Sequence, residues 1–179
     1  MPLTFTTDAA TLSTGLLVAR LVLGLAMAAH GTQKLLGWFG GHGLAGTAGF
    51  FGMLGFRPGR LFATTAAVAE VAGGLLVALG LLGPVGPALI ISTMVVAMLA
   101  VHAKDGFFAQ SNGIELALLY AVGAAALALT GPGAYSVDAL LGLDVLTSTT
   151  LAVAAVVAGL IGGVGTMFLR RPTPAVAGD

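Results

Sequence analysis

The stretch LFATTAAVAEVAGGLLVALGLL, residues 61–82, decides the fold, because it is apolar, long, and carries a single ionisable residue, Glu70. A helix of about 20 apolar residues is long enough to cross a bilayer. A charge in hydrocarbon costs roughly 2.5 to 3.5 kcal/mol on insertion scales, so such residues usually face the interior of a helix bundle. Residues 61–82 therefore predict a membrane-spanning helix whose Glu70 face is turned toward other helices.

The same kind of stretch recurs along the chain. Membrane-spanning helices are predicted at five places, namely 12–36, 61–82, 84–103, 113–130 and 148–169. Ionisable residues again lie inside these stretches or at their edges: Arg20 in the first, His102 at the end of the third and Glu115 at the start of the fourth. For the helix starts, Thr11 or Ser13, Asn112 and Ser148 are suitable N-caps. The expected fold is all-α and polytopic.

The composition excludes several classes of protein. The chain is 58% hydrophobic and 8% charged, whereas a soluble domain carries about 25% charged residues. It is therefore expected to be an integral membrane protein in contact with the lipid bilayer. Its formal net charge is zero, so nucleic acid is not an expected partner. The chain has no cysteine, which excludes thiolate nucleophiles, iron–sulfur clusters and cysteine-bound zinc within it.

The basic residues predict an orientation. Apart from Arg20, they all fall on one side of a five-span arrangement: Lys34, Arg57, Arg60, Lys104, Arg170 and Arg171. Because basic loops stay in the cytoplasm, the N-terminus is expected outside and the C-terminus in the cytoplasm.

Two connecting segments have patterns of their own. Leu44, Phe51 and Leu54 share a helical face, so 44–54 is predicted to be a short interfacial helix that either packs against the bundle end or covers a cavity. In the segment 131–141, Gly-Pro-Gly ends the preceding span, and Ser136 is predicted to cap a short helix. A structural role is expected for this second segment.

An ion pair is predicted between the first two spans. Arg20 and Lys34 lie on one face of the first helix, with Gly24 between them. If the two spans run in opposite directions, Arg20 lies only about 6 Å from the depth of Glu70, at 1.5 Å per residue. We therefore expect Arg20 and Glu70 to pair inside the bundle, either to fix the helix register or to work in a functional site.

A second polar cluster is expected at the cytoplasmic end. His30, Lys34, His102 and Glu115 should lie there at similar depth. Histidine and carboxylate groups handle protons near neutral pH, so the cluster could receive a quinone head group, a small anion or a proton relay. The alternative is that these side chains simply meet lipid headgroups. A haem or metal held by His30 and His102 is a further alternative, but no spacing in the chain is specific for such ligands, and no metal site is predicted.

The fifth span has a ridge of small residues, Ala155, Gly159 and Gly163. Such ridges allow close helix packing. We expect the ridge to contact a helix of the same bundle, a partner protein or a second copy of the chain.

An ordered set of short motifs resembles the DoxX family of small bacterial membrane proteins. Over about residues 15–142, the matching pieces are Arg20-x-x-x-Gly24, His30-Gly31-x-x-Lys34-Leu35, Glu70-x-x-Gly73-Gly74, His102-x-x-x-Gly106-Phe107-Phe108, Gly113-x-Glu115 and Gly131-Pro132-Gly133-x-Tyr135-Ser136-x-Asp138. The resemblance implies a four-helix transmembrane bundle over 1–147 in a bacterial plasma membrane. Residues 148–179 would then add a fifth transmembrane helix and a short cytoplasmic tail.

The resemblance also implies a link to redox chemistry, because the family takes its name from a subunit of a thiosulfate:quinone oxidoreductase. The first hypothesis is a membrane protein that binds a quinone or another lipid-soluble molecule as part of an oxidoreductase system. Its ligand-binding or proton-relay candidates are Arg20, His30, Lys34, Glu70, His102 and Glu115.

The alternative is a noncatalytic accessory subunit of a respiratory or detoxification complex, docked to a redox enzyme through the fifth span. A transporter is less favoured, because the sequence shows no repeats of broken helices.

Overall fold

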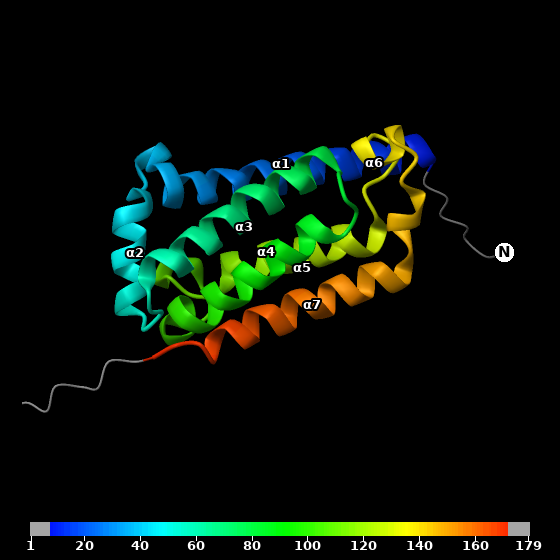
Figure 1. Cartoon of the computed structure of the whole chain (residues 1–179). Helices are drawn as coiled ribbons and strands as arrows, with labels where there is room; N and C mark the ends of the chain where they lie inside the picture. The colour runs from blue at the N-terminus through cyan, green and yellow to red at the C-terminus, as the bar shows by residue number, and fades with distance from the viewer. Residues whose placement is uncertain (1–7, 172–179) are drawn as a thin grey trace, which may run out of the picture.

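The computed structural model describes residues 8–171 and shows an all-α polytopic membrane protein (Figure 1). The helices, in chain order, are α1 (Ala9–Leu36), α2 (Gly43–Met53), α3 (Gly59–Leu79), α4 (Val85–Ala97), α5 (Glu115–Thr130), α6 (Val137–Leu140) and α7 (Thr149–Met167). A π-helical turn, Met98–His102, and a 3-10 turn, Ala103–Asp105, continue α4. Further 3-10 turns occur at Trp38–Gly40, Ala109–Ser111 and Asp144–Thr147.

All five predicted long helices are present, with ends within about three residues of those expected when the turns that continue α4 to Asp105 are included. Within residues 8–171, four segments are long and apolar enough to cross a membrane: α1, α3, Val85–Asp105 and α7. The fifth, α5, is also apolar but has only 16 residues. The expectation of an all-α polytopic protein is confirmed. The predicted tail at 172–179 lies outside the described residues.

The helix starts correct two expectations and confirm two. Asp8, rather than Thr11 or Ser13, caps α1: its carboxylate accepts hydrogen bonds from Ala10 N at 2.7 Å and Thr11 N at 3.0 Å. The hydroxyl of Thr11 also donates to Asp8, and these bonds hold the pKa of the Asp8 carboxyl below its ordinary value.

At the other starts, Asn112 is not a cap, because it is in the left-handed region (φ 65°) and α5 begins after Ile114. Ser148 and Ser136 do cap α7 and α6 as predicted, each accepting from a backbone N–H three residues on.

Glycines set the register of α1 against α3. A Cβ atom on Gly74 would lie 2.5 Å from the backbone of Ala28 and of Gly24, so the two helices touch along their backbones there. Gly31 is packed as closely against Ala67 and Val71. This register places Arg20 beside Gly80 at the far end of α3, and it places the Glu70 turn beside Gly31.

The core lies between α1, α3, α4 and α5, where Met27, Val77, Ile90, Met94 and Ala124 are buried together. In Figure 1, α2 runs across one end of this bundle and α6 lies at the other end. The predicted interfacial helix at 44–54 is therefore α2, and it packs on α3 and α1.

The small-residue ridge of α7 packs within the same chain. Gly159 faces the backbone of Ala88 together with Ile91, and Gly163 faces Val95 and the carbonyl of Ser92. Any Cβ at these positions would clash with α4, since its nearest neighbours lie between 2.5 and 3.1 Å. Of the three expected contacts for this ridge, the structure shows the one within the bundle.

Candidate functional site

Arg20 is 2% exposed and lies at the α6 end of the bundle. One Nη2–H donates to the carbonyl of Tyr135. The negative charge of Asp138 attracts the guanidinium electrostatically. The Asp138 carboxylate itself accepts from Leu82 N at 2.9 Å and Gly83 N at 2.6 Å. These contacts fasten the α6 segment to the turn between α3 and α4.

The predicted Arg20–Glu70 ion pair is wrong. In the glycine-set register, Arg20 is level with Gly80, ten residues beyond Glu70 on α3, which is about 15 Å along a helix. The depth estimate of 6 Å failed because it took no account of how far α1 slides along α3 before their glycines meet.

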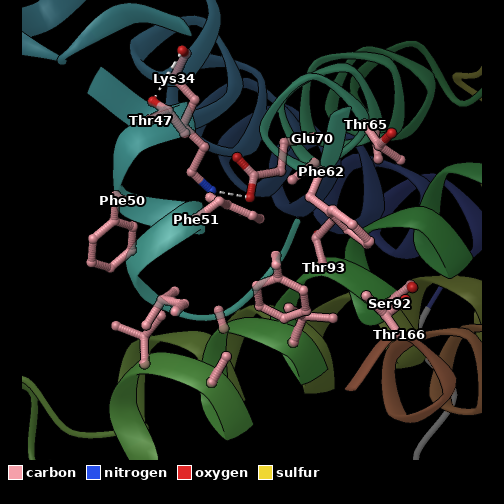
Figure 2. Close-up of a pocket in the computed structure, with 18 of the residues that line it drawn as sticks. Lys34, Thr47, Phe50, Phe51, Phe62, Thr65, Glu70, Ser92, Thr93 and Thr166 are labelled. Atoms are coloured by element: carbon pink, nitrogen blue, oxygen red, sulfur yellow. Dashed lines mark hydrogen bonds and ion pairs between the residues drawn. The ribbon is translucent and has the colours of Figure 1, made fainter. Parts of the chain in front are cut away.

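Glu70 pairs instead with Lys34, in the last turn of α1 (Figure 2). Glu70 is 1% exposed, and its second oxygen, Oε2, is buried without a hydrogen-bond partner among the described groups. The single hydroxyl proton of Thr47 on α2 is shared between the carbonyl of Gly43 in its own helix, at 2.8 Å, and the carbonyl of Lys34, at 3.2 Å. Three helices, α1, α2 and α3, therefore meet beside this ion pair.

The Lys34–Glu70 pair lies in the wall of a cavity of about 660 Å³. The cavity is bounded by α2, α3, the α4 segment with its π-helical turn, and the end of α7. Its lining is mainly apolar and includes four phenylalanines, Phe50, Phe51, Phe56 and Phe62. Figure 2 shows Phe50 and Phe51 on α2 on one side and Thr93 and Ser92 on α4 on the other. The volume is within the range of about 300 to 1,000 Å³ that is usual for small-molecule sites.

Residues 44–54 are expected either to pack against the bundle end or to cover a cavity, and α2 does both. This helix packs against the bundle end, and Thr47, Phe50 and Phe51 also line the cavity. It therefore covers the cavity from that side.

His102 ends the π-helical turn and also lines the cavity. Its Nδ1 lies 2.7 Å from the carbonyl oxygen of Asn112. Because a carbonyl only accepts, Nδ1 carries a proton, and Nε2 is a hydrogen-bond acceptor whenever the ring is neutral. π-Helical turns occur frequently at functional sites.

The other two candidates, His30 and Glu115, do not line the cavity. His30 Nδ1 lies 2.9 Å from its own helix at Ala26 O, and the ring meets Tyr120 edge to face with centroids 5.8 Å apart. Glu115 accepts from Ala109 N at 2.8 Å and so fixes the loop before α5. Within residues 8–171, no group of three or more His, Asp or Glu side chains is placed to hold a metal ion.

The structure therefore brings three of the six candidates to one cavity, Lys34, Glu70 and His102, and leaves Arg20, His30 and Glu115 elsewhere. Sequence reasoning missed the hydroxyls in its wall, Thr47, Thr65, Ser92, Thr93 and Thr166. Their spacing carries no signal, because Ser and Thr in apolar helices commonly bond to the backbone of their own turn. Thr65, Thr93 and Thr166 all do so here.

The comparisons with known proteins agree with the motif resemblance over the first part of the chain. The DoxX family model matches residues 15–103. No curated protein and no solved structure matches the chain. The matched segment contains Arg20, Lys34, Glu70 and His102, whereas α5, α6 and α7 follow it. With its membrane-spanning helices and this match from α1 to the π-helical turn, the chain belongs to the DoxX family of membrane proteins.

Proposed function

We propose that the chain binds a quinone in the cavity between α2, α3, α4 and α7, as part of an oxidoreductase system of the bacterial plasma membrane. The observation that carries this proposal is the placement of the buried Lys34–Glu70 pair in the wall of an otherwise apolar, aromatic-lined cavity. A flat apolar ring with polar oxygens matches such a lining. A bound quinone would supply two-electron, two-proton redox chemistry.

The ion pair offers both kinds of hydrogen bond that a ring oxygen needs. The Lys34 ammonium has three N–H donors, of which one is directed to Glu70 Oε1, so it can also donate to a ligand carbonyl. Glu70 Oε2 is an acceptor without a partner among the described groups, and it fits a ligand hydroxyl. A buried acceptor left unsatisfied costs about 1 to 3 kcal/mol, which favours a ligand that satisfies it.

His102 supports the proton part of the proposal. When the ring is neutral, Nε2 is an acceptor, because Nδ1–H donates to the carbonyl of Asn112. Histidine exchanges protons with water near neutral pH. In the proposed function, Glu70 exchanges a proton with the ligand, and His102 passes protons between the cavity and the solvent at the α2 end.

The accessory-subunit alternative loses one support. It places a redox enzyme against the fifth span, and one face of that span, the small-residue ridge at Gly159 and Gly163, is covered by α4. The cavity with its buried ion pair makes ligand binding the function that the geometry supports best.

The test compares purified protein with its Glu70→Gln variant, which keeps the shape of the side chain and removes its charge. Quinone is measured in an organic extract of each protein and by titration with a soluble short-chain quinone. We expect the parent to retain quinone and Glu70→Gln to bind about tenfold more weakly, the factor for about 1.4 kcal/mol. Glu115→Gln is the matched control, because Glu115 lies outside the cavity. Absence of quinone from the parent, or equal losses in the two variants, would contradict the proposal.

A further inference from the structure

The end of α7 forms a wall of the cavity although it lies beyond the family match. That match ends at residue 103, and the helices before it supply three sides of the cavity. Thr166, in the last turn of α7, and Leu169, two residues beyond its end, supply the fourth. The close seating of Gly159 and Gly163 on α4 brings this end of the helix up to the cavity.

A set of contacts holds the end of α7 on the turn between α2 and α3. Arg170 Nε donates to the carbonyl of Leu54 at 2.9 Å, and Arg171 N donates to the carbonyl of Gly55 at 2.7 Å. The Arg170 guanidinium also lies over the ring of Phe56, 5.7 Å from its centroid. Leu54 and Phe56 themselves line the cavity. The contacts therefore join the end of α7 to the α2–α3 turn, and both segments line the cavity.

Of the two arginines, Arg170 makes the larger energetic contribution to holding the end of α7 on the α2–α3 turn. It contributes a side-chain hydrogen bond and a cation–π contact, and Phe56 is 0% exposed beneath it. In the contact with this turn, Arg171 contributes only its backbone N–H. Any substitution other than proline retains that N–H.

We infer that α7 is the fourth wall of the ligand cavity and that Arg170 holds this wall closed against the α2–α3 turn. Arg170 is thus a positioning residue that controls how readily a ligand enters and leaves. The inference rests on the proposed function only for the identity of the ligand; closure of the cavity by α7 is a separate claim.

The chain has no cysteine, so a single introduced thiol reports access to the cavity without interference. Thr93→Cys places that thiol on the cavity wall. Its rate of reaction with a small membrane-permeant maleimide is measured in the otherwise unchanged protein, with Arg170→Ala, and with Arg171→Ala. We expect Arg170→Ala to raise the rate about fivefold, the factor for about one ordinary hydrogen bond, and Arg171→Ala to leave it unchanged.

Two controls separate opening from unfolding. Leu160→Cys, on the exposed face of α7, should react at one rate with and without Arg170→Ala. Arg170→Lys keeps the charge but lacks Nε–H, so it should give an intermediate reaction rate at Thr93→Cys. If Arg170→Ala loses helix content, the rate with Arg170→Lys tests the closure instead. Equal rates for the Arg170 and Arg171 variants would overturn the inference. Because no quinone is added, failure of quinone binding would leave this result standing.

Discussion

Glu70 and Arg20 are both buried charges, and the protein stabilises them by different means. Glu70 has an ion pair with Lys34, whereas Arg20 has the carbonyl of Tyr135 and the nearby carboxylate of Asp138. Removing one partner of a buried pair is costly, because the charge left behind has no compensation. The two charges therefore belong to separate groups, one in the cavity wall and one at the α6 end.

A double-mutant cycle on the unfolding free energy in detergent checks this separation. Lys34→Ala and Glu70→Ala share an ion pair, so their effects should be non-additive by about 0.5 to 3 kcal/mol. Arg20→Ala and Glu70→Ala should add within about 0.5 kcal/mol, because they are far apart. A large coupling between Arg20 and Glu70, with none between Lys34 and Glu70, would restore the pairing that the sequence suggested.

Asp138 should be important for stability rather than for ligand binding. It is 1% exposed, and both carboxylate oxygens accept backbone hydrogen bonds. Asp138→Asn turns one acceptor into a donor, which should cost about 2 kcal/mol and lower the melting temperature. Exposed Asp144 provides the control, and Asp144→Asn should melt like the parent. Loss of quinone binding from Asp138→Asn at unchanged melting temperature would argue against a purely structural role.

At the scale of the elements, length and hydropathy were enough to predict the five long helices, because a bilayer fixes how many apolar residues a span needs. Local sequence also predicts the short helix α2 and the N-caps Ser136 and Ser148. The partner of Glu70 does not, since it depends on the sliding of α1 along α3. That register comes from contacts of Gly24, Gly31 and Gly74, which are distant in sequence.

The glycine contacts give a test in which two like substitutions have opposite effects. A Cβ at Gly74 would lie 2.5 Å from the backbone of α1, whereas one at Gly15 has nothing within 4 Å. Gly74→Ala should therefore force the helices apart and cost about 1 to 3 kcal/mol. Gly15→Ala should stabilise the exposed turn by up to about 1 kcal/mol. Thermal unfolding measures both, and a stabilised Gly74→Ala protein would show that α1 and α3 are not in this contact.

The whole molecule has an apolar exterior that is suited to contact with lipid. Val22, Leu119 and Ile161, on three different helices, are 68%, 61% and 67% exposed. In Figure 1 the described part of the chain begins near α6 and ends near α2. Every basic residue except Arg20 belongs to the ends of elements near α2: Lys34, Arg57, Arg60, Lys104, Arg170 and Arg171.

This charge asymmetry predicts that the α2 end faces the cytoplasm. A phosphatase reporter that works only outside the cytoplasm should be active when fused after residue 135 and inactive when fused after residue 104. A fluorescent protein that folds only in the cytoplasm should give the reverse pattern. Activity of the phosphatase at residue 104 would invert the orientation.

The central claim is that the cavity between α2, α3, α4 and α7 holds the lipid-soluble ligand. Photolabelling of the purified protein with an azido-quinone, followed by mass spectrometry of peptides, tests it most directly. The account predicts adducts on the cavity walls, within residues 47–70 and 92–102, that disappear when unlabelled quinone is in excess. Adducts confined to lipid-facing residues such as Val22, Leu119 and Ile161, or adducts that excess quinone does not displace, would contradict it.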